Sequence, residues 1–450
     1  MLGLNRELWL LFALNLAIGF ANQFVQPLFP LFLSGLGASE VEIGLVLSLA
    51  NVVSMALMIP SGLLMNRIGK RSVLLLSVVL SSAPPLLISL ARDWRVVAPL
   101  YIVFSASFSF FIVARMAIVS DNATPGNRAT LFSVMNLAWP VGGIVAPIVS
   151  GRVVEGLGWA PIFQVASGVM AASLVPTLML GRGGEGGDHG RQGGGSILGG
   201  EYLRFISVVF GFHFLMGVVE GVFSAVLPLY LRDEMLLSES LIGLFYTASS
   251  VLILLIQVPS GRLADRFGRR RVLLLSLLPL PFLFGAWGLV GEWWLLLVLF
   301  TAASGFRSMT WPSSLAILTD FVPPGLLGSA VGIRMTSMRL GSTVGPLLAG
   351  YLYGAVGPVA PFLASAVVSA GMVVAALGFS EKREEGRGGL GRGLGLGPLP
   401  VLGVVVEGCC DDEGCDGGLG EGCGVCWAPG EEGDDEEADA DGYDGVGGYP

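Results

Sequence analysis

The sequence carries little charge, and its first 408 residues contain no cysteine. Charged residues make up 13% and hydrophobic residues 53% of the 450 positions, whereas soluble domains are nearer a quarter charged. All five cysteines lie between Cys409 and Cys426, so disulfide bonds do not hold the core of the protein together. The shortage of charge excludes an ordinary soluble domain.

The sequence also lacks the residue patterns of common enzyme and cofactor sites. It has no nucleophile paired with a base, no cluster of metal ligands in its apolar part and no P-loop, so ATP is not the energy source. The pair Cys423 and Cys426 fits the spacing of no standard zinc site. We therefore expect no enzymatic activity, no cofactor, no bound metal and no nucleic-acid partner.

What the sequence does contain is a series of apolar runs of about twenty residues, each long enough to cross a hydrocarbon core of ~30 Å. A soluble chain would interrupt such runs with a polar face. We predict an all-α polytopic membrane protein with twelve transmembrane helices. These helices are predicted at 8–33, 42–65, 72–91, 96–120, 129–151, 159–180, 204–231, 240–263, 271–290, 293–319, 328–353 and 358–379.

Composition divides the chain into four parts. Residues 1–181 and 204–380 each hold six predicted helices, and the Gly-rich segment 182–203 between them predicts a flexible cytoplasmic linker. Residues 381–450 hold 18 of the 34 acidic residues and only four of the 25 basic ones. This last segment predicts a disordered acidic tail, since it cannot bury a core.

Lysine and arginine are distributed unequally between the loops. The termini, the linker and the loops after the even-numbered helices hold 17 of them, and the opposite loops hold four. Because basic loops stay in the cytoplasm, we predict that both termini are cytoplasmic. The protein is then a multi-pass component of the cell membrane, in contact with its lipid, and we expect a monomer.

The two halves are copies of one unit. An offset of 199 residues places SGRLADRFGRRRVLLLS (260–276) on SGLLMNRIGKRSVLLLS (61–77), and it also aligns Trp94 with Trp293 and Asp121 with Asp320. Six is an even number of helices, so both copies enter the membrane from the same side. The sequence therefore predicts two parallel six-helix repeats.

The duplicated loop resembles the G-x-L-x-D-R-x-G-R-R signature of the major facilitator superfamily, with Asn66 in place of the aspartate in the first copy. The resemblance implies a gating motif: the aspartate faces the N-terminus of a neighbouring helix in the outward-open state. The alternative role for the arginines is only to hold this loop on the cytoplasmic side of the membrane. The residues concerned are Gly62, Asn66, Arg67, Gly69, Gly261, Asp265, Arg266, Gly268, Arg269 and Arg270, together with Asp121 and Asp320.

A second pair of segments, GGIVAPIVSG (142–151) and GSTVGPLLAG (341–350), is rich in glycine and proline. They resemble a motif of drug/proton antiporters in the same superfamily, and ordinary helix packing explains them equally well. Arg115, six residues before Asp121, resembles a stretch of exporter-like members; its alternative is a juxtamembrane ion pair. The glycines and prolines of the pair are Gly143, Pro147, Gly151, Gly341, Gly345, Pro346 and Gly350.

Polar residues inside the predicted helices are costly in lipid and therefore candidates for function. Glu220 is the only acidic residue deep in a helix, and His213 lies seven residues before it on one helix face. A carboxylate that moves between an apolar environment and an arginine can take up and release a proton; a static ion pair is the alternative. The candidates for proton coupling or substrate binding are Glu220, His213, Arg307, Arg339, Asn15, Asn22, Gln26 and Arg115.

The sequence thus predicts a secondary active transporter of a small organic molecule that works by alternating access. We expect proton-coupled export, in which protons move inward as the substrate moves out. Two mid-membrane arginines leave open an uptake symporter or a facilitator for an organic anion. A membrane sensor that signals through the tail is the alternative from another class.

Overall fold

The computed structural model describes residues 6–122, 131, 134–180, 200–323 and 326–379, and every regular element in these ranges is a helix. The first half contains α1 (Arg6–Val25), η1 (Gln26–Leu28), α2 (Phe29–Gly35), α3 (Glu40–Ile68), α4 (Lys70–Ile88), α5 (Trp94–Asp121), α7 (Ala138–Leu157), α8 (Ala160–Ala172) and α9 (Leu174–Met179). The second half contains α10 (Gly200–Asp233), α11 (Glu239–Phe267), α12 (Arg269–Leu277), α13 (Leu280–Gly285), η2 (Ala286–Leu289), α14 (Trp293–Phe321), α15 (Leu327–Ala355) and α16 (Ala360–Leu377).

Ten of the described segments are long and apolar enough to cross a membrane. α14 and α15, of 29 residues each, complete the twelve predicted helices, so the all-α polytopic fold is confirmed. The predicted tail and nearly all of the predicted linker lie outside the described residues. The four-part division of the chain therefore stays a prediction.

Two of the predicted helices are interrupted next to a proline. The run 8–33 continues from α1 through η1 into α2, with Pro27 and Pro30 at the starts of the second and third pieces. The run 271–290 divides into α12, α13 and η2, and α13 has Pro281 at its start. Proline suits the first turn of a helix, where its missing N–H is not needed, and it breaks a helix that continues from before it.

Tight turns join α3 to α4 and α11 to α12. Gly69 has φ 85° and Gly268 has φ 94°, a conformation that residues with a Cβ rarely adopt. Each glycine is both the C-cap of the first helix and the N-cap of the next. We call the end of the bundle that holds these two turns the motif end, and the opposite end the far end.

The two halves repeat the same contacts at the motif end. Lys70 forms an ion pair with Asp121, and Arg269 forms one with Asp320. Arg71 and Arg270 donate to the backbone carbonyls of Leu178 and Leu377, respectively. Every pair of equivalents differs by 199 residues, so the parallel repeat predicted from the sequence holds in space.

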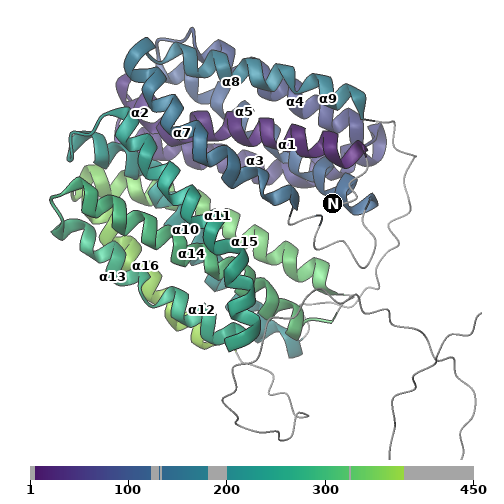
Figure 1. Ribbon diagram of the computed structural model, residues 1–450, viewed down its shortest axis with the longest axis vertical. Coiled ribbons are helices and arrows are strands. Elements are labelled where there is room, and N and C mark those ends of the chain that lie inside the picture. The colour runs from purple at the N-terminus through teal and green to yellow at the C-terminus, as the bar shows by residue number, and fades with distance from the viewer. Residues whose placement is uncertain (1–5, 123–130, 132–133, 181–199, 324–325, 380–450) are drawn as a thin grey trace, which may run out of the picture. The chain divides into compact units, whose positions relative to one another are not determined.

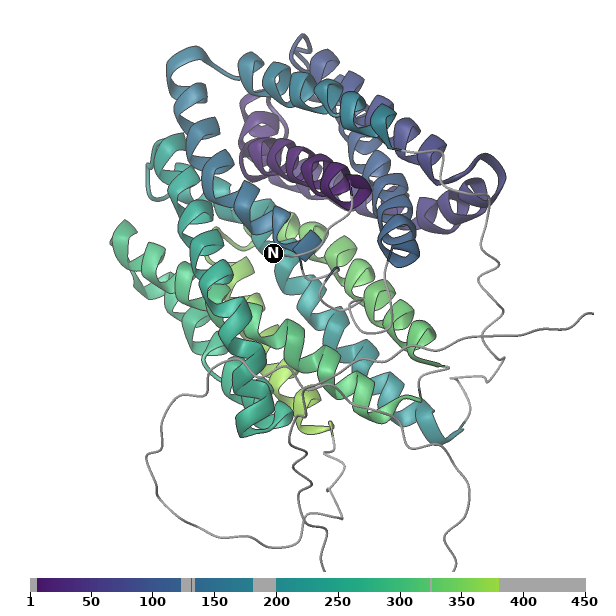
Figure 2. The same ribbon diagram turned by 45° about the vertical axis from the view of Figure 1, so that its right-hand side comes forward.

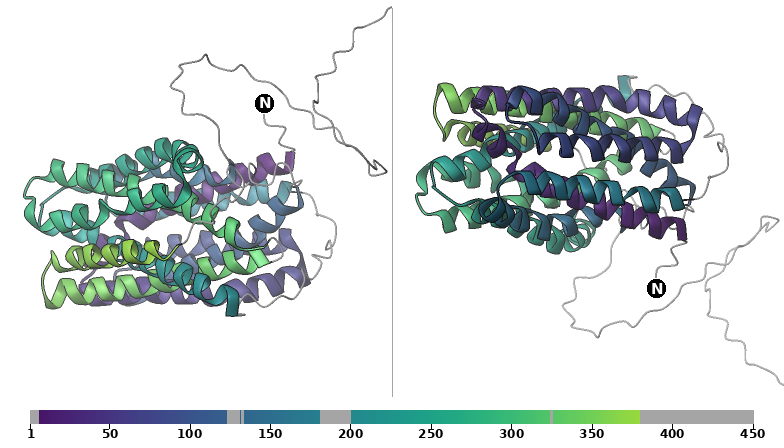
Figure 3. Two further views of the ribbon diagram at one scale, coloured as in Figure 1. Left: turned by 90° about the horizontal axis from the view of Figure 1, so that it is seen from below. Right: turned by 90° about the horizontal axis from the view of Figure 1, so that it is seen from above.

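The helices of the two halves form two groups that lie side by side (Figures 1 and 2), and most helix axes run along a shared direction (Figure 3). Within the halves α1 packs on α7 and α10 on α15; between the halves α7 packs on α11 and α3 on α15. Helices in lipid approach closely through small residues. A methyl group at Gly341 or Gly345 would collide with the backbone of α10, and one at Gly151 or Gly350 would collide with the opposite half.

Polar contacts between the halves extend from the far end to the middle of the helices. Near the far end, Arg232 on α10 donates to Ser34 Oγ at 2.8 Å. At mid-helix, Asn51 Nδ2 on α3 donates to Ser342 O on α15 at 2.9 Å, and Ser48 Oγ donates to Thr343 O at 2.6 Å. These bonds hold the two halves together in the far-end part of the bundle.

Candidate functional site

A line of polar side chains runs between α10 and α14 from mid-helix toward the motif end. Glu220 faces Arg307, Met216 faces Thr310, and His213 faces Ser314. On each helix these positions are three or four residues apart and therefore share one face. The two helices are antiparallel, so the residue numbers of the facing positions fall along α10 as they rise along α14.

Glu220 and Arg307 form an ion pair without a hydrogen bond. Arg307 Nη1 lies 3.6 Å from Glu220 Oε2, and this buried oxygen has no hydrogen-bond partner. The Glu220 side chain is nevertheless 44% exposed and that of Arg307 28% exposed, so the exposed area of Glu220 lies on the rest of the side chain. A loose, half-open pair of this kind can exchange one partner for a proton or a ligand.

Arg339 on α15 is the second cation close to Glu220, near enough to interact with it electrostatically. Among the residues that the structure describes, the guanidinium of Arg339 has no hydrogen-bond partner; only its backbone carbonyl accepts a bond, from Thr343 Oγ1. Two arginines therefore share one carboxylate at this place. The local charge is positive, and neither cation is neutralised by a close, hydrogen-bonded anion.

His213 holds a different arginine, Arg334 on α15. Arg334 Nε donates to His213 Nε2 at 2.7 Å, and because an arginine can only donate, His213 Nε2 is the acceptor. The proton of the neutral imidazole is therefore on Nδ1, which donates to Val209 O at 2.8 Å. Both side chains are 1% exposed, so a buried cation is bound by a neutral ring.

The remaining contacts of Arg334 are also neutral. Its Nη2 donates to Trp311 O at 3.2 Å and to Ser314 Oγ at 3.3 Å, and its guanidinium carbon lies 4.1 Å from the centroid of the Trp311 ring. A cation over an indole face is attracted by the ring quadrupole. We call His213, Trp311, Ser314 and Arg334 the C-terminal node.

The first half has a corresponding cluster, which we call the N-terminal node: Asn15, Arg115 and Asn136. Arg115 Nη1 donates to Asn15 Oδ1 at 3.1 Å and Nη2 to Asn136 Oδ1 at 3.4 Å. Asn15 in turn donates to the carbonyl of Met135. Asn15 is 0% and Arg115 5% exposed, so this node also buries a guanidinium among neutral partners.

The two nodes occupy equivalent places in the repeat. The offset of 199 residues aligns Arg115 with Ser314 and Met135 with Arg334, and an offset of 198 aligns Asn15 with His213. Each half thus buries one arginine where its first, fourth and fifth membrane-crossing helices meet. The arginine comes from the fourth helix in the first half and from the fifth helix in the second.

The other polar candidates lie apart from these clusters. Asn22 is buried, and its amide donates to Ile18 O on its own helix at 2.9 Å. Gln26 lies in η1 and is exposed. Among the described residues, no group of three or more His, Cys, Asp or Glu side chains could hold a metal ion.

The gating-motif residues gather at the motif end. Asn66, Arg67 and Arg266 are exposed there, and the side chain of Asp265 lies outside the described residues. Arg269 pairs with Asp320 and also donates to Ala316 O at 3.0 Å. The ion pairs of Asp121 and Asp320 each lie within one half, so in this structure they clamp the helices of a half to one another.

Asp320→Asn is expected to change the free energy of unfolding by less than ~1 kcal/mol, because exposed ion pairs contribute little and this carboxylate is 45% exposed. Asp121→Asn is the matched control in the first half, with a carboxylate that is 39% exposed. Thermal unfolding in detergent micelles measures both. A much larger loss in either variant would mean that the pair stabilises the fold itself.

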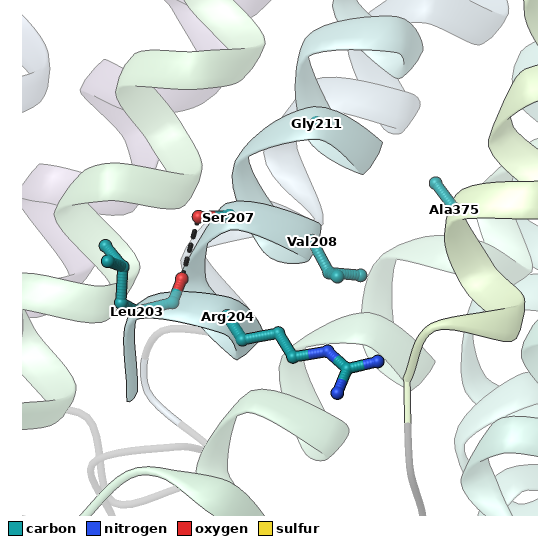
Figure 4. A pocket seen from close by; sticks show the side chains of 6 residues that line it. All are labelled: Leu203, Arg204, Ser207, Val208, Gly211 and Ala375. Carbon is teal, nitrogen blue, oxygen red and sulfur yellow. Dashed lines mark hydrogen bonds between the residues drawn. The ribbon is translucent and has the colours of Figure 1, made fainter. Parts of the chain in front are cut away.

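Two cavities flank the first turns of α10 at the motif end. One, of about 610 Å³, lies between α10 and α16; Figure 4 shows that it is lined by Leu203, Arg204, Ser207, Val208, Gly211 and Ala375. Its one hydroxyl, Ser207 Oγ, is already bonded to Leu203 O at 2.7 Å. The other, of about 590 Å³, lies between α10 and α15 and includes Phe210 and Thr336.

Sequence reasoning did not select the whole C-terminal node. Ser314 and Asn136 are not among the candidates, and Arg334 and Trp311, although conspicuous inside predicted helices, were assigned to no site. The repeat itself conceals them, because serine aligns with Arg115 and methionine with Arg334. A search for polar residues on the fourth and fifth helices of both halves would have found Arg115 on the fourth helix of the first half and Arg334 on the fifth helix of the second.

Most of the chain is similar to proteins that are already known. The profile of the Major Facilitator Superfamily matches residues 11–201 and 209–406. The multidrug resistance protein MdtG of Serratia proteamaculans is 22% identical over 78% of this chain and 88% of its own length. A Na(+), Li(+), K(+)/H(+) antiporter of Planococcus maritimus is 27% identical over 28% of this chain, and the match spans only 31% of the antiporter.

A solved structure has the same fold. A bacterial homolog of the human lysosomal transporter Spinster superposes with a TM-score of 0.67 at 16% identity, covering 84% of this chain and 98% of its own. Identity this low establishes the shared architecture of the helices and nothing about the substrate. The profile match, by contrast, extends over both halves of the repeat.

Proposed function

The chain belongs to the Major Facilitator Superfamily, and we propose that it couples the movement of protons through Glu220 to the export of a small organic molecule across the cell membrane. Transport proceeds by alternating access, with the substrate bound between the two halves. Antiport and multidrug resistance occur in the names of similar proteins, which supports export. The observation that carries the proposal is the half-open Glu220–Arg307 pair.

Glu220 is suited to proton coupling because its two environments differ. In the structure its carboxylate faces Arg307 at 3.6 Å without a hydrogen bond, so the contact between them is purely electrostatic. Loss of that contact would leave a carboxylate in a membrane interior, where the neutral, protonated form is favoured. A change in the distance between α10 and α14 can therefore load or release one proton.

The contacts between the halves support the assignment of the structure to one state of the transport cycle. If the motif end is cytoplasmic, as the basic loops predict, the inter-half bonds of Asn51, Ser48 and Arg232 close the outer side. The structure then corresponds to a state that receives substrate from the cytoplasm. The cavity of about 590 Å³ between α10 and α15 is of the size that small organic ligands occupy. All of its lining residues belong to the second half, so it would form one wall of a path between the halves.

The roles of the other candidates follow from their burial. Arg307 and Arg339 adjust the charge around Glu220 and contact the substrate. The two nodes, with His213 and Asn15, hold Arg334 and Arg115 in place inside each half. Asn22 and Gln26 are proposed to line the substrate path. The exposed ion pairs of Asp121 and Asp320 orient neighbouring helices within each half and contribute little to its stability.

A second candidate, uptake of an organic anion with a proton, is favoured by Arg339. Its guanidinium has no hydrogen-bond partner among the described residues, and it shares Glu220 with Arg307. An anion bound by both arginines would release Glu220 to take up a proton, so anion and proton would bind together and move together. A cationic cargo would instead compete with the proton for Glu220, as export by exchange requires.

Glu220→Gln is expected to abolish proton movement evoked by substrate, because glutamine keeps the shape of the side chain but has no group that binds and releases a proton near neutral pH. The purified protein is placed in liposomes with a trapped pH dye, and pools of cationic and anionic compounds are added separately. Glu292→Gln, at an exposed position before α14, is the matched control and should behave as wild type.

The direction of the proton signal separates the two candidates. Protons that move against an added cationic compound support export by exchange, and protons that move with an anionic compound support uptake. Undiminished proton movement in Glu220→Gln would refute coupling through Glu220, whatever the substrate. Binding of compounds without any proton movement in the wild type would refute proton coupling altogether.

A further inference from the structure

α3 and α11 occupy equivalent places in the two halves, but their N-termini at the far end are capped differently. Ser39 precedes α3, and Glu42 on the first turn completes a capping box. The Glu42 carboxylate accepts from Ser39 N at 2.8 Å and from Ser39 Oγ at 2.9 Å. The capping box thus satisfies the N–H groups of Ser39 and Glu42 with partners that all lie in one half.

α11 cannot form the same box. Ser238 precedes it with nearly the same backbone angles as Ser39, φ −71° and ψ 158°, but its side chain makes no capping bond. Leu241 stands where α3 has Glu42. The acid comes instead from the first half: Glu155, near the end of α7, accepts from Ser240 N at 2.8 Å and from Ser240 Oγ at 2.5 Å.

In their packing the two interfaces between the halves are otherwise alike. α7 meets the start of α11 at Gly151, and α15 meets the start of α3 at Gly350; in each case a methyl group on the glycine would collide with the backbone carbonyl of the first helical residue, Glu239 or Glu40. The residue equivalent to Glu155 in α15 is Gly354. An acidic cap that crosses between the halves is therefore present at one of the two interfaces.

We propose that Glu155 is a positioning residue of the transport cycle: its carboxylate caps α11 from the opposite half and latches the far end closed. The inference rests on the proposed alternating access but not on the substrate or the coupling ion. When the far end opens, α7 must leave α11, and the first turn of α11 then loses its cap. Opening between α15 and α3 carries no such cost, because Glu42 remains in place.

The loss of an N-cap shifts an equilibrium by about fivefold, and a carboxylate near a helix N-terminus adds a favourable charge–dipole interaction. Glu155→Ala, which removes both acceptor oxygens, is therefore expected to raise the ratio of far-end-open to far-end-closed molecules about fivefold. Glu155 is exposed to solvent, so water satisfies the freed N–H groups, and the variant should fold.

Spin labels measure this ratio without any transport assay. The five tail cysteines are replaced by serine in the full chain, and cysteines are introduced at Leu90 and Leu289, which are 72% and 88% exposed at the far end of the two halves. The distance distribution between the labels gives the fraction of molecules with separated halves. A failure of proton coupling would leave this readout unchanged, so the latch and the proposed function are tested separately.

Glu42→Ala is the matched control, because it removes an equivalent cap that lies within one half. It should lower the melting temperature and leave the distance distribution unchanged. Ser240→Ala, which removes one donor and keeps the carboxylate, should shift the distribution in the same direction as Glu155→Ala but less. The proposal is overturned if Glu155→Ala leaves the distribution unchanged, or if Glu42→Ala shifts it equally, since Glu155 would then act as a helix cap alone.

Discussion

Replacing His213 with leucine is expected to destabilise the protein by about 2–3 kcal/mol, the cost of leaving a buried charged donor without its acceptor. His213 Nε2 receives the Nε–H of Arg334 at 2.7 Å, and both residues are 1% exposed. Water has no access to the freed donor. The guanidinium would keep only its weaker bonds to Trp311 O and Ser314 Oγ.

The double variant His213→Leu/Arg334→Met should recover most of that loss. Replacing both members of a buried polar pair with apolar residues of similar size is often neutral or stabilising, whereas removing one member leaves an unpaired group. Thermal unfolding in detergent of the wild type, the two single variants and the double variant gives the four stabilities of a double-mutant cycle. An additive double variant would show that Arg334 and His213 do not depend on each other, contrary to the geometry of the C-terminal node.

Transport by the double variant answers a separate question. A stable protein that still moves its substrate would limit the node to holding α10, α14 and α15 together. A stable protein that has lost transport would show that the buried charge of Arg334 acts in the cycle. Asn15→Leu is the corresponding variant of the N-terminal node, and we expect it to destabilise the protein in the same direction, because Arg115 then loses its shortest bond.

Gly341→Ala is expected to destabilise the protein by about 3 kcal/mol or more, at the upper end of the range for overpacking. A Cβ at this position would collide with Phe214 O, and its next neighbours are Val218 N at 2.8 Å and Gly217 C at 3.0 Å. All three belong to the backbone of α10. Since a backbone cannot rotate away as a side chain can, α15 would have to separate from α10.

Gly332→Ala, on the same helix, is expected to have the opposite sign. A Cβ there would meet no atom within 4 Å, and alanine is favoured over glycine in a helix by about 0.5–1 kcal/mol. Unfolding of both variants in the same detergent compares them directly. Equal effects at the two positions would mean that helix propensity, and not the contact with α10, explains the glycine at 341.

Much of the site could be predicted from individual residues, but its pairings could not. Glu220, Arg307, Arg339, His213 and Arg115 are conspicuous because charge and polarity are rare in these helices. The sequence left open whether Glu220 faces Arg307 or Arg339. The choice depends on how α14 and α15 are rotated against α10, and glycines such as Gly341 and Gly345 set that rotation through backbone contacts.

Glu155 and Arg334 illustrate a second limit. Arg334 is conspicuous in the sequence as a charge inside a predicted helix, but the sequence assigned it no site role, and Glu155 lies near a helix end where acids are common. The significance of each comes from a partner more than 80 residues away in the chain, Ser240 at a separation of 85 and His213 at a separation of 121. No local spacing connects such partners.

Periodicity, composition and the offset of 199 residues were sufficient to predict the twelve helices and their parallel repeat, because a membrane-crossing helix must be apolar along its length and must satisfy its own backbone. Those requirements are local and are visible in any window of twenty residues. The family followed from the resemblance of the duplicated loop to a known signature. Tertiary structure alone decided which buried cation meets which acceptor and that α11 takes its cap from the opposite half. These contacts depend on the packing of glycine-lined helices against one another, and the order of residues along one helix does not contain that information.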